Sequence, residues 1–320
     1  MGYSLYVHLI VISPPTNPIS IFGNIVHIML SSFSRPFPKP NTFFRIRIAT
    51  LTAVLLAGTM LPSNSNAQAQ GDSKEGSSDW KFTLGVAGRY FADYKGSDDY
   101  DFKPLPLVGI LWRDIVSIGS HKGSPGLKVN FLQVNGSTPR DRLVMSTSFG
   151  YFSGRDQDDN DALQGLGDLN GGVTAKLTAD YKLQKFGAFL SATRDMSGDR
   201  EGTTSNAGLR YTFDLGSPKT QLTSGTSVTW ADDSYMKNIF GISATQAANS
   251  AFSYSAHSAG SGFSEAGVNV SVRHFLNQSV GVMGQISYKQ LLGDAANSPI
   301  VEGQGSSGQL SALFGMSYNW

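Results

Sequence analysis

The C-terminal segment Leu310–Trp320 alternates between apolar residues and small or polar ones. Leu313 is the one exception to this alternation. Because successive side chains of a strand point to opposite faces, the segment predicts a strand with one apolar face. The same two-residue period recurs along the chain, downstream of a segment typical of exported proteins. We therefore expect the apolar faces to meet lipid.

The composition narrows the class of fold. The mean hydropathy of −0.14 excludes a bundle of membrane helices, whereas a barrel whose strands are half polar is compatible with it. A net charge of +1 implies no general attraction to nucleic acid. The chain has no cysteine, so backbone pairing and packing must hold the fold together.

The N-terminal region resembles a targeting segment. Arg45 and Arg47 precede an uncharged stretch over 48–60, and small residues suited to signal peptidase lie at 65–67 and 67–69. The apolar stretch is too short for a membrane anchor and is followed by Pro62. The pattern predicts a cleaved signal peptide.

These features predict a division of the chain into three parts. Residues 1–67 are expected to be an N-terminal extension and signal peptide, 68–79 a short periplasmic linker, and 80–320 an outer-membrane β-barrel. We interpret the fold as all-β: a transmembrane antiparallel barrel of about twelve strands, or ten if 103–120 forms one irregular element. The predicted strands are 80–92, 105–112, 115–119, 126–134, 142–152, 171–182, 185–195, 204–214, 219–230, 263–274, 279–289 and 308–320.

The connections between these strands alternate in length. Longer ones are predicted at 93–104, 120–125, 153–170, 196–203, 231–262 and 290–307, with short turns between them. Long outer loops and short periplasmic turns are typical of outer-membrane barrels. The 231–262 loop is rich in Ser, Ala and Gly, a composition that indicates mobility more than a binding surface.

The faces opposite the apolar ones would line the lumen, and their charges lean basic. The candidate lumen cations are Arg89, Lys176, Arg210, Arg273 and Lys289, accompanied by Lys81, Asp180, Asp195, Glu265 and Gln285. Twelve strands tilted at about 45° give a backbone radius of roughly 13 Å, which leaves a narrow bore or none. Two interpretations stay open: the charges pair across a filled barrel, or they select small anions.

Four stretches of the chain carry a resemblance to a known family. They run over 88–106, 163–170, 235–250 and 291–301, and the last, Leu-Leu-Gly-Asp-Ala-Ala-Asn-Ser-Pro-Ile-Val, is the most specific. On these stretches the chain resembles the MipA/OmpV proteins over roughly 80–320. The matching positions are Tyr94, Gly96, Ser97, Pro104, Pro106, Gly165, Gly167, Asp168, Phe240, Gly241, Gly293, Asp294, Ser298 and Pro299.

The resemblance implies an outer-membrane protein in contact with lipid and lipopolysaccharide. The member that gives the family its name is a scaffold that links a lytic transglycosylase to a peptidoglycan synthase. Other members are associated with permeability, adhesion or drug susceptibility. A non-catalytic scaffold is therefore the leading interpretation, and a narrow channel for small anions and a loop-mediated adhesin are the alternatives.

The motif residues suit loops for physical reasons. Gly165, Gly167 and Gly293 allow turns that other residues resist, and Pro299 restricts the backbone. Asp168 and Asp294 are suited to accept backbone N–H groups within turns. We expect the loops to fold inward or against one another, so that the motifs serve loop architecture or contact a partner directly.

The sequence carries no signature of catalysis or metal binding. An outer-membrane lipid hydrolase needs His-x-Ser on one strand face, but the residues two positions after His121, His257 and His274 are Gly123, Ala259 and Leu276. The acidic pair Asp98–Asp99 alone does not make a protease. The acidic run 156–161 lacks the glycine and the final glutamate of an EF-hand, with Asp161 and Gly167 at those positions. No enzyme activity, cofactor or metal is predicted.

The signal peptide leads to a direct prediction. N-terminal sequencing of protein extracted from membranes should begin at the residue after Ala67 or after Ala69, because signal peptidase requires small residues at those positions. An N-terminus upstream of Arg45 would contradict the predicted cleavage.

Overall fold

The computed structural model of the chain describes residues 79–119, 126–138 and 140–320. The predicted signal peptide, the linker up to residue 78 and the predicted loop at 120–125 lie outside the described residues.

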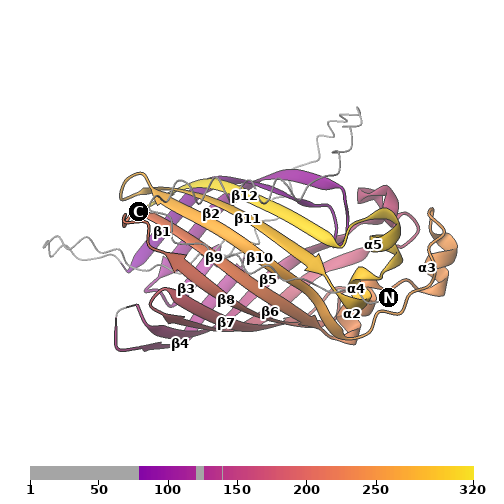
Figure 1. Cartoon of the computed structure of the whole chain (residues 1–320), viewed down its shortest axis with the longest axis horizontal. Coiled ribbons are helices and arrows are strands. Elements are labelled where there is room, and N and C mark those ends of the chain that lie inside the picture. The colour runs from indigo at the N-terminus through magenta and orange to yellow at the C-terminus, as the bar shows by residue number, and fades with distance from the viewer. Residues whose placement is uncertain (1–78, 120–125, 139) are drawn as a thin grey trace, which may run out of the picture. The chain divides into compact units, whose positions relative to one another are not determined.

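Twelve antiparallel strands close into one barrel (Figure 1). Each strand pairs with its neighbours in the sequence, and β1 pairs with β12 along the register from Thr83–Asn319 to Tyr90–Ala312. The strands are β1 (Trp80–Ala92), β2 (Tyr100–Trp112), β3 (Val116–Gly119), β4 (Gly126–Asn135), β5 (Arg142–Arg155), β6 (Leu169–Leu183), β7 (Phe186–Asp195), β8 (Thr203–Phe213), β9 (Thr220–Ala231), β10 (Gly262–Phe275), β11 (Val280–Leu291) and β12 (Gly308–Asn319). The prediction of a twelve-stranded all-β barrel is confirmed.

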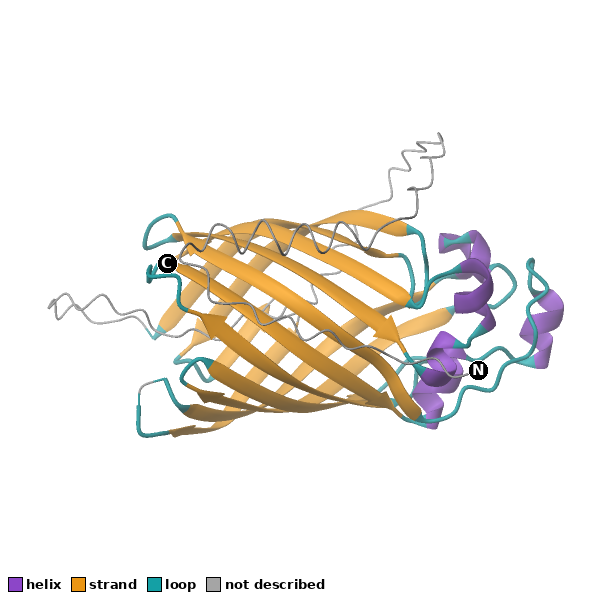
Figure 2. Ribbon diagram, viewed as in Figure 1, coloured by secondary structure: helices purple, strands orange, loops and turns teal. Residues whose placement is uncertain are grey.

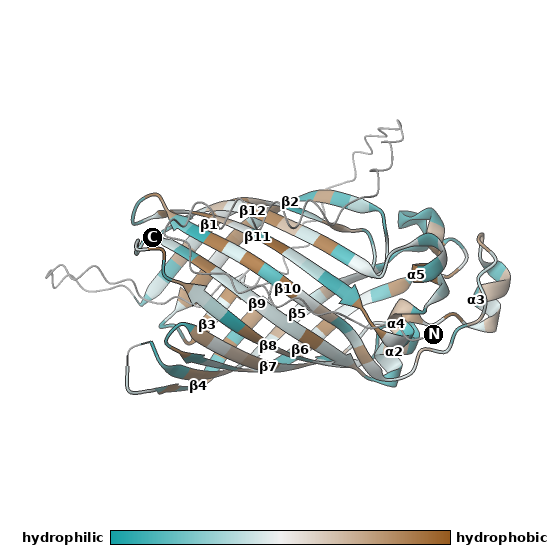
Figure 3. Ribbon diagram, viewed as in Figure 1, coloured by the Kyte–Doolittle hydropathy of each residue, from teal (hydrophilic) through white to brown (hydrophobic). Residues whose placement is uncertain are grey.

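The outer surface of the barrel is apolar because the alternating residues place their large side chains there. Leu190, Leu209 and Phe314 are 60%, 64% and 68% exposed. Figure 3 shows the alternation as brown and teal segments that follow one another along single strands. Exposed aliphatic and aromatic side chains suit contact with hydrocarbon. Closure of the sheet is also needed there, because hydrocarbon offers no hydrogen-bond partner to backbone groups.

Leu313, the exception to the C-terminal alternation, points into the barrel. It is buried with Ala87 and Leu107, and the partly buried Leu105 and Met283 pack against them. The wall formed by β11, β12, β1 and β2 thus carries an apolar cluster on its inner side. The exception therefore marks a local filling of the lumen and does not interrupt the strand.

Strand β2 begins at Tyr100, whereas the sequence analysis placed its start at 105 and a loop before it. Pro104 and Pro106 therefore lie within a strand, which corrects their expected position in or beside a loop. The strand can include both prolines because β3 is short and pairs only with Gly109–Trp112 of β2. A proline lacks the N–H that a central strand needs, and both prolines lie in the half of β2 that β3 does not reach.

Short helices gather at the end of the barrel where the longer loops lie (Figure 2). They are η2 (Gln157–Asp159), η3 (Asp161–Leu163), α2 (Asp233–Phe240), α3 (Ala244–Asn249), α4 (Gly293–Ala296) and α5 (Pro299–Gln304). None of these helices is predicted from the sequence, and the composition of 231–262 indicates mobility instead. Local capping explains α2 and α3, since Asp232 accepts the Tyr235 N–H and Ser243 forms a capping box with Gln246. Among the described residues, no helix is long and apolar enough to cross a membrane.

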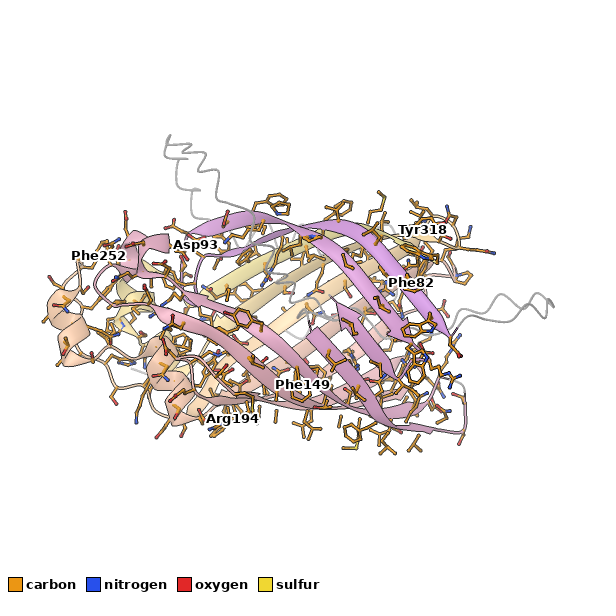
Figure 4. The ribbon with its side chains drawn as sticks, turned by 180° about the vertical axis from the view of Figure 1, so that it is seen from behind. Phe82, Asp93, Phe149, Arg194, Phe252 and Tyr318 are labelled. Atoms are coloured by element: carbon orange, nitrogen blue, oxygen red, sulfur yellow. The ribbon has the colours of Figure 1, made fainter. Side chains whose placement is uncertain are left out.

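The other end of the barrel carries short turns and paired aromatic rings. Trp80 lies 6.3 Å from Trp112, and Phe82 stacks on Trp320 with ring centroids 5.8 Å apart. In Figure 4 Phe82 and Tyr318 lie at this end, whereas Asp93 and Phe252 lie at the helical end. Because amphipathic rings favour the interface and short turns face the periplasm, we assign this end to the periplasm.

The two faces of one strand should respond differently to a charge. Val270→Lys places an ammonium on the outward face of β10 and should destabilise the barrel by about 2–4 kcal/mol if it lies near the bilayer midplane. The neighbouring Ser271→Lys points inward and should cost little. Urea unfolding in lipid vesicles measures both, and equal losses would contradict the assignment of the faces.

Candidate functional site

Five loops at the helical end pack together, and we call them the cap: residues 93–99, 156–168, 196–202, 232–261 and 292–307. Two buried apolar clusters hold the cap together. One contains Ala231, Tyr235, Met236, Phe240, Ala259, Leu291, Ala295 and Val301, and the other contains Tyr94, Ala162, Leu163, Leu166, Ile242, Tyr254 and Ile300. The first cluster joins loops 232–261 and 292–307, and the second joins these two with 93–99 and 156–168. Loop 196–202 is attached by a hydrogen bond from Asn238 to the Arg200 carbonyl.

Loop 93–99 lies against the last loop of the chain. The Tyr94 hydroxyl donates to the Gln304 carbonyl at 3.2 Å, and Ser97 forms an isolated antiparallel bridge with Gly305. Gly96 has φ +97°, and a Cβ at this position would lie 2.4 Å from Cγ2 of Val301. Glycine is therefore required here both for the backbone conformation and for the close approach.

Loop 156–168 is organised around one glutamine. The side chain of Gln157 accepts the N–H groups of Gly165 and Gly167, both at 3.2 Å, while Asp168 accepts the N–H of Gln157 at 2.9 Å. Gln246 of α3 then donates to the carbonyl of Leu166 at 2.6 Å. These bonds tie the second motif stretch to the third.

The last motif stretch closes against α2 and the loop that follows it. Asp294 accepts the Gly260 N–H at 2.8 Å, and the buried Ser298 hydroxyl donates to the Phe240 carbonyl at 2.6 Å. Gly241 ends α2 by donating its N–H to the Lys237 carbonyl. Gly293 has φ +53° at the start of α4, and Pro299 occupies the first turn of α5. The structure thus brings the four motif stretches together, with Pro104 and Pro106 on β2 outside the cap.

A charged cluster connects the cap to the barrel wall. Lys95 lies 3.1 Å from Glu265 of β10, and its ammonium donates to the Tyr235 hydroxyl at 3.1 Å. Glu265 also accepts from Lys289 of β11 at 2.7 Å. A register shift between Phe263 and Glu265 marks a bulge in β10, and bulges re-aim the side chains beside them. Lys95 and Tyr235 lie in motif stretches that the sequence identified, but their contacts were not predicted, because the partners lie far away in the chain.

A second cation approaches Tyr235 from another loop. Arg200 binds Asp195 of β7 through two nitrogens, one of them at 2.6 Å. Its guanidinium lies 4.0 Å from the ring centre of Phe152 and 5.5 Å from that of Tyr235. Tyr235 is therefore in contact with two cations, an arrangement that cation–π attraction favours.

The electrostatics of the cap hold Lys95 and Arg200 in their charged forms and Tyr254 in its neutral form. Burial lowers the pKa of Lys95, but the Glu265 carboxylate and the Tyr235 hydroxyl together outweigh burial and hold that pKa above its ordinary value. Burial likewise lowers the pKa of Arg200, but its hydrogen bonds to the Asp195 carboxylate, together with Tyr235, hold that pKa above its ordinary value. Burial raises the pKa of Tyr254 to about 12, so this phenol stays neutral at physiological pH.

The predicted lumen charges divide into paired and unpaired groups. Arg210 donates to Asp180 at 2.6 Å, and Lys289 binds Glu265. Arg89 lies over the Phe91 ring at 4.3 Å, and Arg273 lies 6.0 Å from the Phe275 ring centre. Within the described part of the chain, Arg89, Lys176 and Arg273 form no ion pair. Pairing across the barrel therefore accounts for only part of the set.

Sequence reasoning also missed three inward cations, Lys128, Arg142 and Lys182. The sequence contains a signal for them, because each lies in or at the end of a predicted strand, next to an apolar residue that would point to the opposite face. Lys128, for example, separates Leu127 from Val129. Assigning faces to every strand would have found them.

The acidic run 156–161 serves to cap short helices. Asp156 accepts the Asp158 N–H ahead of η2, and Asn160 accepts the Ala162 N–H ahead of η3. The side chain of His257 bonds the Asp294 carbonyl at 3.0 Å. Over the described residues, no group of three or more His, Cys, Asp or Glu is arranged to hold a metal ion.

Comparison with known proteins adds an identification to this geometry. The family model described as MltA-interacting protein MipA matches residues 84–320, which include every strand except the start of β1. The chain belongs to the MipA family. The match spans the barrel and the whole cap, so both are features of a MipA-family protein. The lipid-compatible closed barrel places it in the outer membrane.

Solved structures to which the chain is similar include outer-membrane proteins of low sequence identity. OmpT of Vibrio cholerae is 8% identical, with 76% of this chain and 97% of that chain covered and a TM-score of 0.35. An outer membrane channel from Pseudomonas putida F1 is 11% identical, with coverage of 78% and 98% and a TM-score of 0.37. OprD of Pseudomonas aeruginosa is 12% identical, with coverage of 74% and 66% and a TM-score of 0.34. No curated protein sequence matches the MipA-family chain significantly.

The cap can be tested through its tightest glycine. Gly96→Ala should loosen the cap, since the new Cβ would collide with Val301 and the left-handed backbone costs about 1–2 kcal/mol for alanine. Gly216→Ala is the matched control, because Gly216 has φ +70° but open space around it. Hydrogen exchange of the cap amides should accelerate in Gly96→Ala alone. Equal exchange in both variants would contradict the close packing.

Proposed function

We propose that this protein is a non-catalytic outer-membrane scaffold that binds a lytic transglycosylase and a peptidoglycan synthase. The observation that carries the proposal is the family match, because the family is described by its interaction with MltA, a lytic transglycosylase. Enzymes that act on the cell wall work in the periplasm. The contact surface is therefore sought at the short-turn end of the barrel.

The short-turn end supports such a contact through exposed, charged side chains. Arg113 pairs with Asp79 at 2.7 Å and Lys185 with Asp214 at 3.7 Å, all of them more than 40% exposed. The described residues of the turns 135–141 and 215–218 lie at this end, between β4 and β5 and between β8 and β9. Exposed charges favour fast and reversible association, and the small area of the turns limits the size of the contact.

Capture by an immobilised lytic transglycosylase tests the scaffold. The detergent-solubilised barrel should be retained, and the double variant Arg140→Glu and Lys219→Glu should be retained several-fold less, because it reverses charges in two turns. Lys237→Glu reverses one charge on α2 in the cap and should be retained like the native protein. Equal retention of both variants would overturn the assignment of the surface, and no retention of the native barrel would overturn the scaffold.

A second function, a narrow path for small anions, is supported by a separate observation. The cations that face the lumen outnumber its carboxylates, since Arg89, Lys176 and Arg273 have no ion-pair partner among the described residues. Single-channel recording in planar bilayers distinguishes the two functions. Discrete, anion-selective steps would favour the channel. A silent barrel that captures the transglycosylase would favour the scaffold.

A further inference from the structure

Four cations face the lumen from three adjacent strands, and we call them the basic patch: Lys128 of β4, Arg142 of β5, and Lys176 and Lys182 of β6. The strand register sets them in two pairs. Lys128 and Lys176 flank Ser148 of β5, and Arg142 lies opposite Lys182, six residues or about 20 Å along the strand toward the short-turn end. The side chain of Lys128 lies within electrostatic range of Arg142, so the two pairs are neighbouring parts of one patch.

The basic patch has more positive than negative charge. Asp180 of β6 attracts Lys128 and Lys182, but this carboxylate already accepts a hydrogen bond from Arg210 at 2.6 Å. Among the described residues, none of the four side chains forms an ion pair or a side-chain hydrogen bond, and Nη2 of Arg142 is buried without a hydrogen-bond partner. A buried guanidinium nitrogen without an acceptor is costly, so the site is incomplete without an anion.

The four cations also repel one another. Lys128 lies within electrostatic range of Arg142 and Lys176, and Lys182 lies within range of Arg142. Lys176 interacts with Lys289 of β11, although β6 and β11 are five strands apart around the barrel. A bound anion would relieve this repulsion.

The charge of the cap has the opposite sign. The described cap loops contain the cations Lys95, Arg200 and Lys237 against the carboxylates Asp93, Asp98, Asp99, Asp156, Asp158, Asp159, Asp161, Asp168, Asp199, Glu201, Asp232, Asp233, Asp294 and Glu302. At the short-turn end the described charges balance. An anion is thus repelled from the cap and meets no such barrier at the short turns.

We infer that the basic patch binds a small oxyanion, a phosphate or a carboxylate, which reaches the lumen from the periplasmic end. The planar guanidinium of Arg142 suits two parallel hydrogen bonds to such a group, and the lysines add point charges. The inference goes beyond the scaffold and does not depend on it, because the site lies inside the wall and the partner contact lies on the turns.

Calorimetric titration of the full detergent-solubilised barrel with inorganic phosphate, at constant ionic strength in chloride, tests the site. Saturable binding is expected, and Arg142→Gln or Lys182→Gln should weaken it about tenfold, the loss expected for one charge-assisted hydrogen bond. Lys237→Gln removes a cation of α2 in the cap, outside the lumen, and should leave binding unchanged. Absence of saturable binding, or equal weakening in all three variants, would overturn the site. Parallel titration with acetate decides between phosphate and carboxylate as the preferred oxyanion.

Thiol labelling provides a second readout that needs no identified ligand. The chain has no cysteine, so Ser148→Cys gives a single thiol between Lys128 and Lys176. An anionic methanethiosulfonate reagent should modify it faster than a cationic reagent of the same size. Ser227→Cys, an inward position of β9 flanked by Gly208 and Gly267, is the control and should show a smaller preference. Equal preferences at both thiols would overturn the patch as an anion site.

Discussion

The structure depends on one constraint: backbone N–H and C=O groups within hydrocarbon must find partners inside the protein. The pairing of β1 with β12 meets this constraint by closing the sheet. Once the sheet is closed, the two-residue period of each strand sorts its side chains into a lipid-facing set and a lumen-facing set. The exposed Leu209 and the neighbouring ion-paired Arg210 on β8 illustrate the result.

The closed wall leaves its two ends free to differ. At the short-turn end the turns are tight and polar, and aromatic rings such as Trp112 and Trp320 surround the rim. At the other end the loops are long enough to bury Phe240, Met236 and Leu163 and so form a core of their own. The protein thus combines a barrel stabilised by strand pairing with a cap stabilised by apolar burial. The cluster of Lys95, Glu265 and Lys289 joins the two.

The sequence predicted the strands well because their signal is local. A barrel strand needs only alternation and flanking turns, and the segments at 80–92 and 126–134 were located almost to the residue. The start of β2 was misplaced because two prolines usually indicate a loop. The helices of the cap were missed for a different reason. They are short, and α2 and α3 occupy a Ser-, Ala- and Gly-rich stretch whose composition resembles that of a mobile loop.

The sequence by itself determined the class of the protein: an exported, cysteine-free chain whose strands have one apolar face, with motifs that resemble the MipA/OmpV family. Those features are written in neighbouring residues, so no contact is needed to recognise them. Only the tertiary structure decided which loops meet, that Lys95 binds Glu265, and that Lys128, Ser148 and Lys176 form one row inside the wall. These contacts join residues far apart in the chain, and the register of strand pairing and the packing of the cap set them.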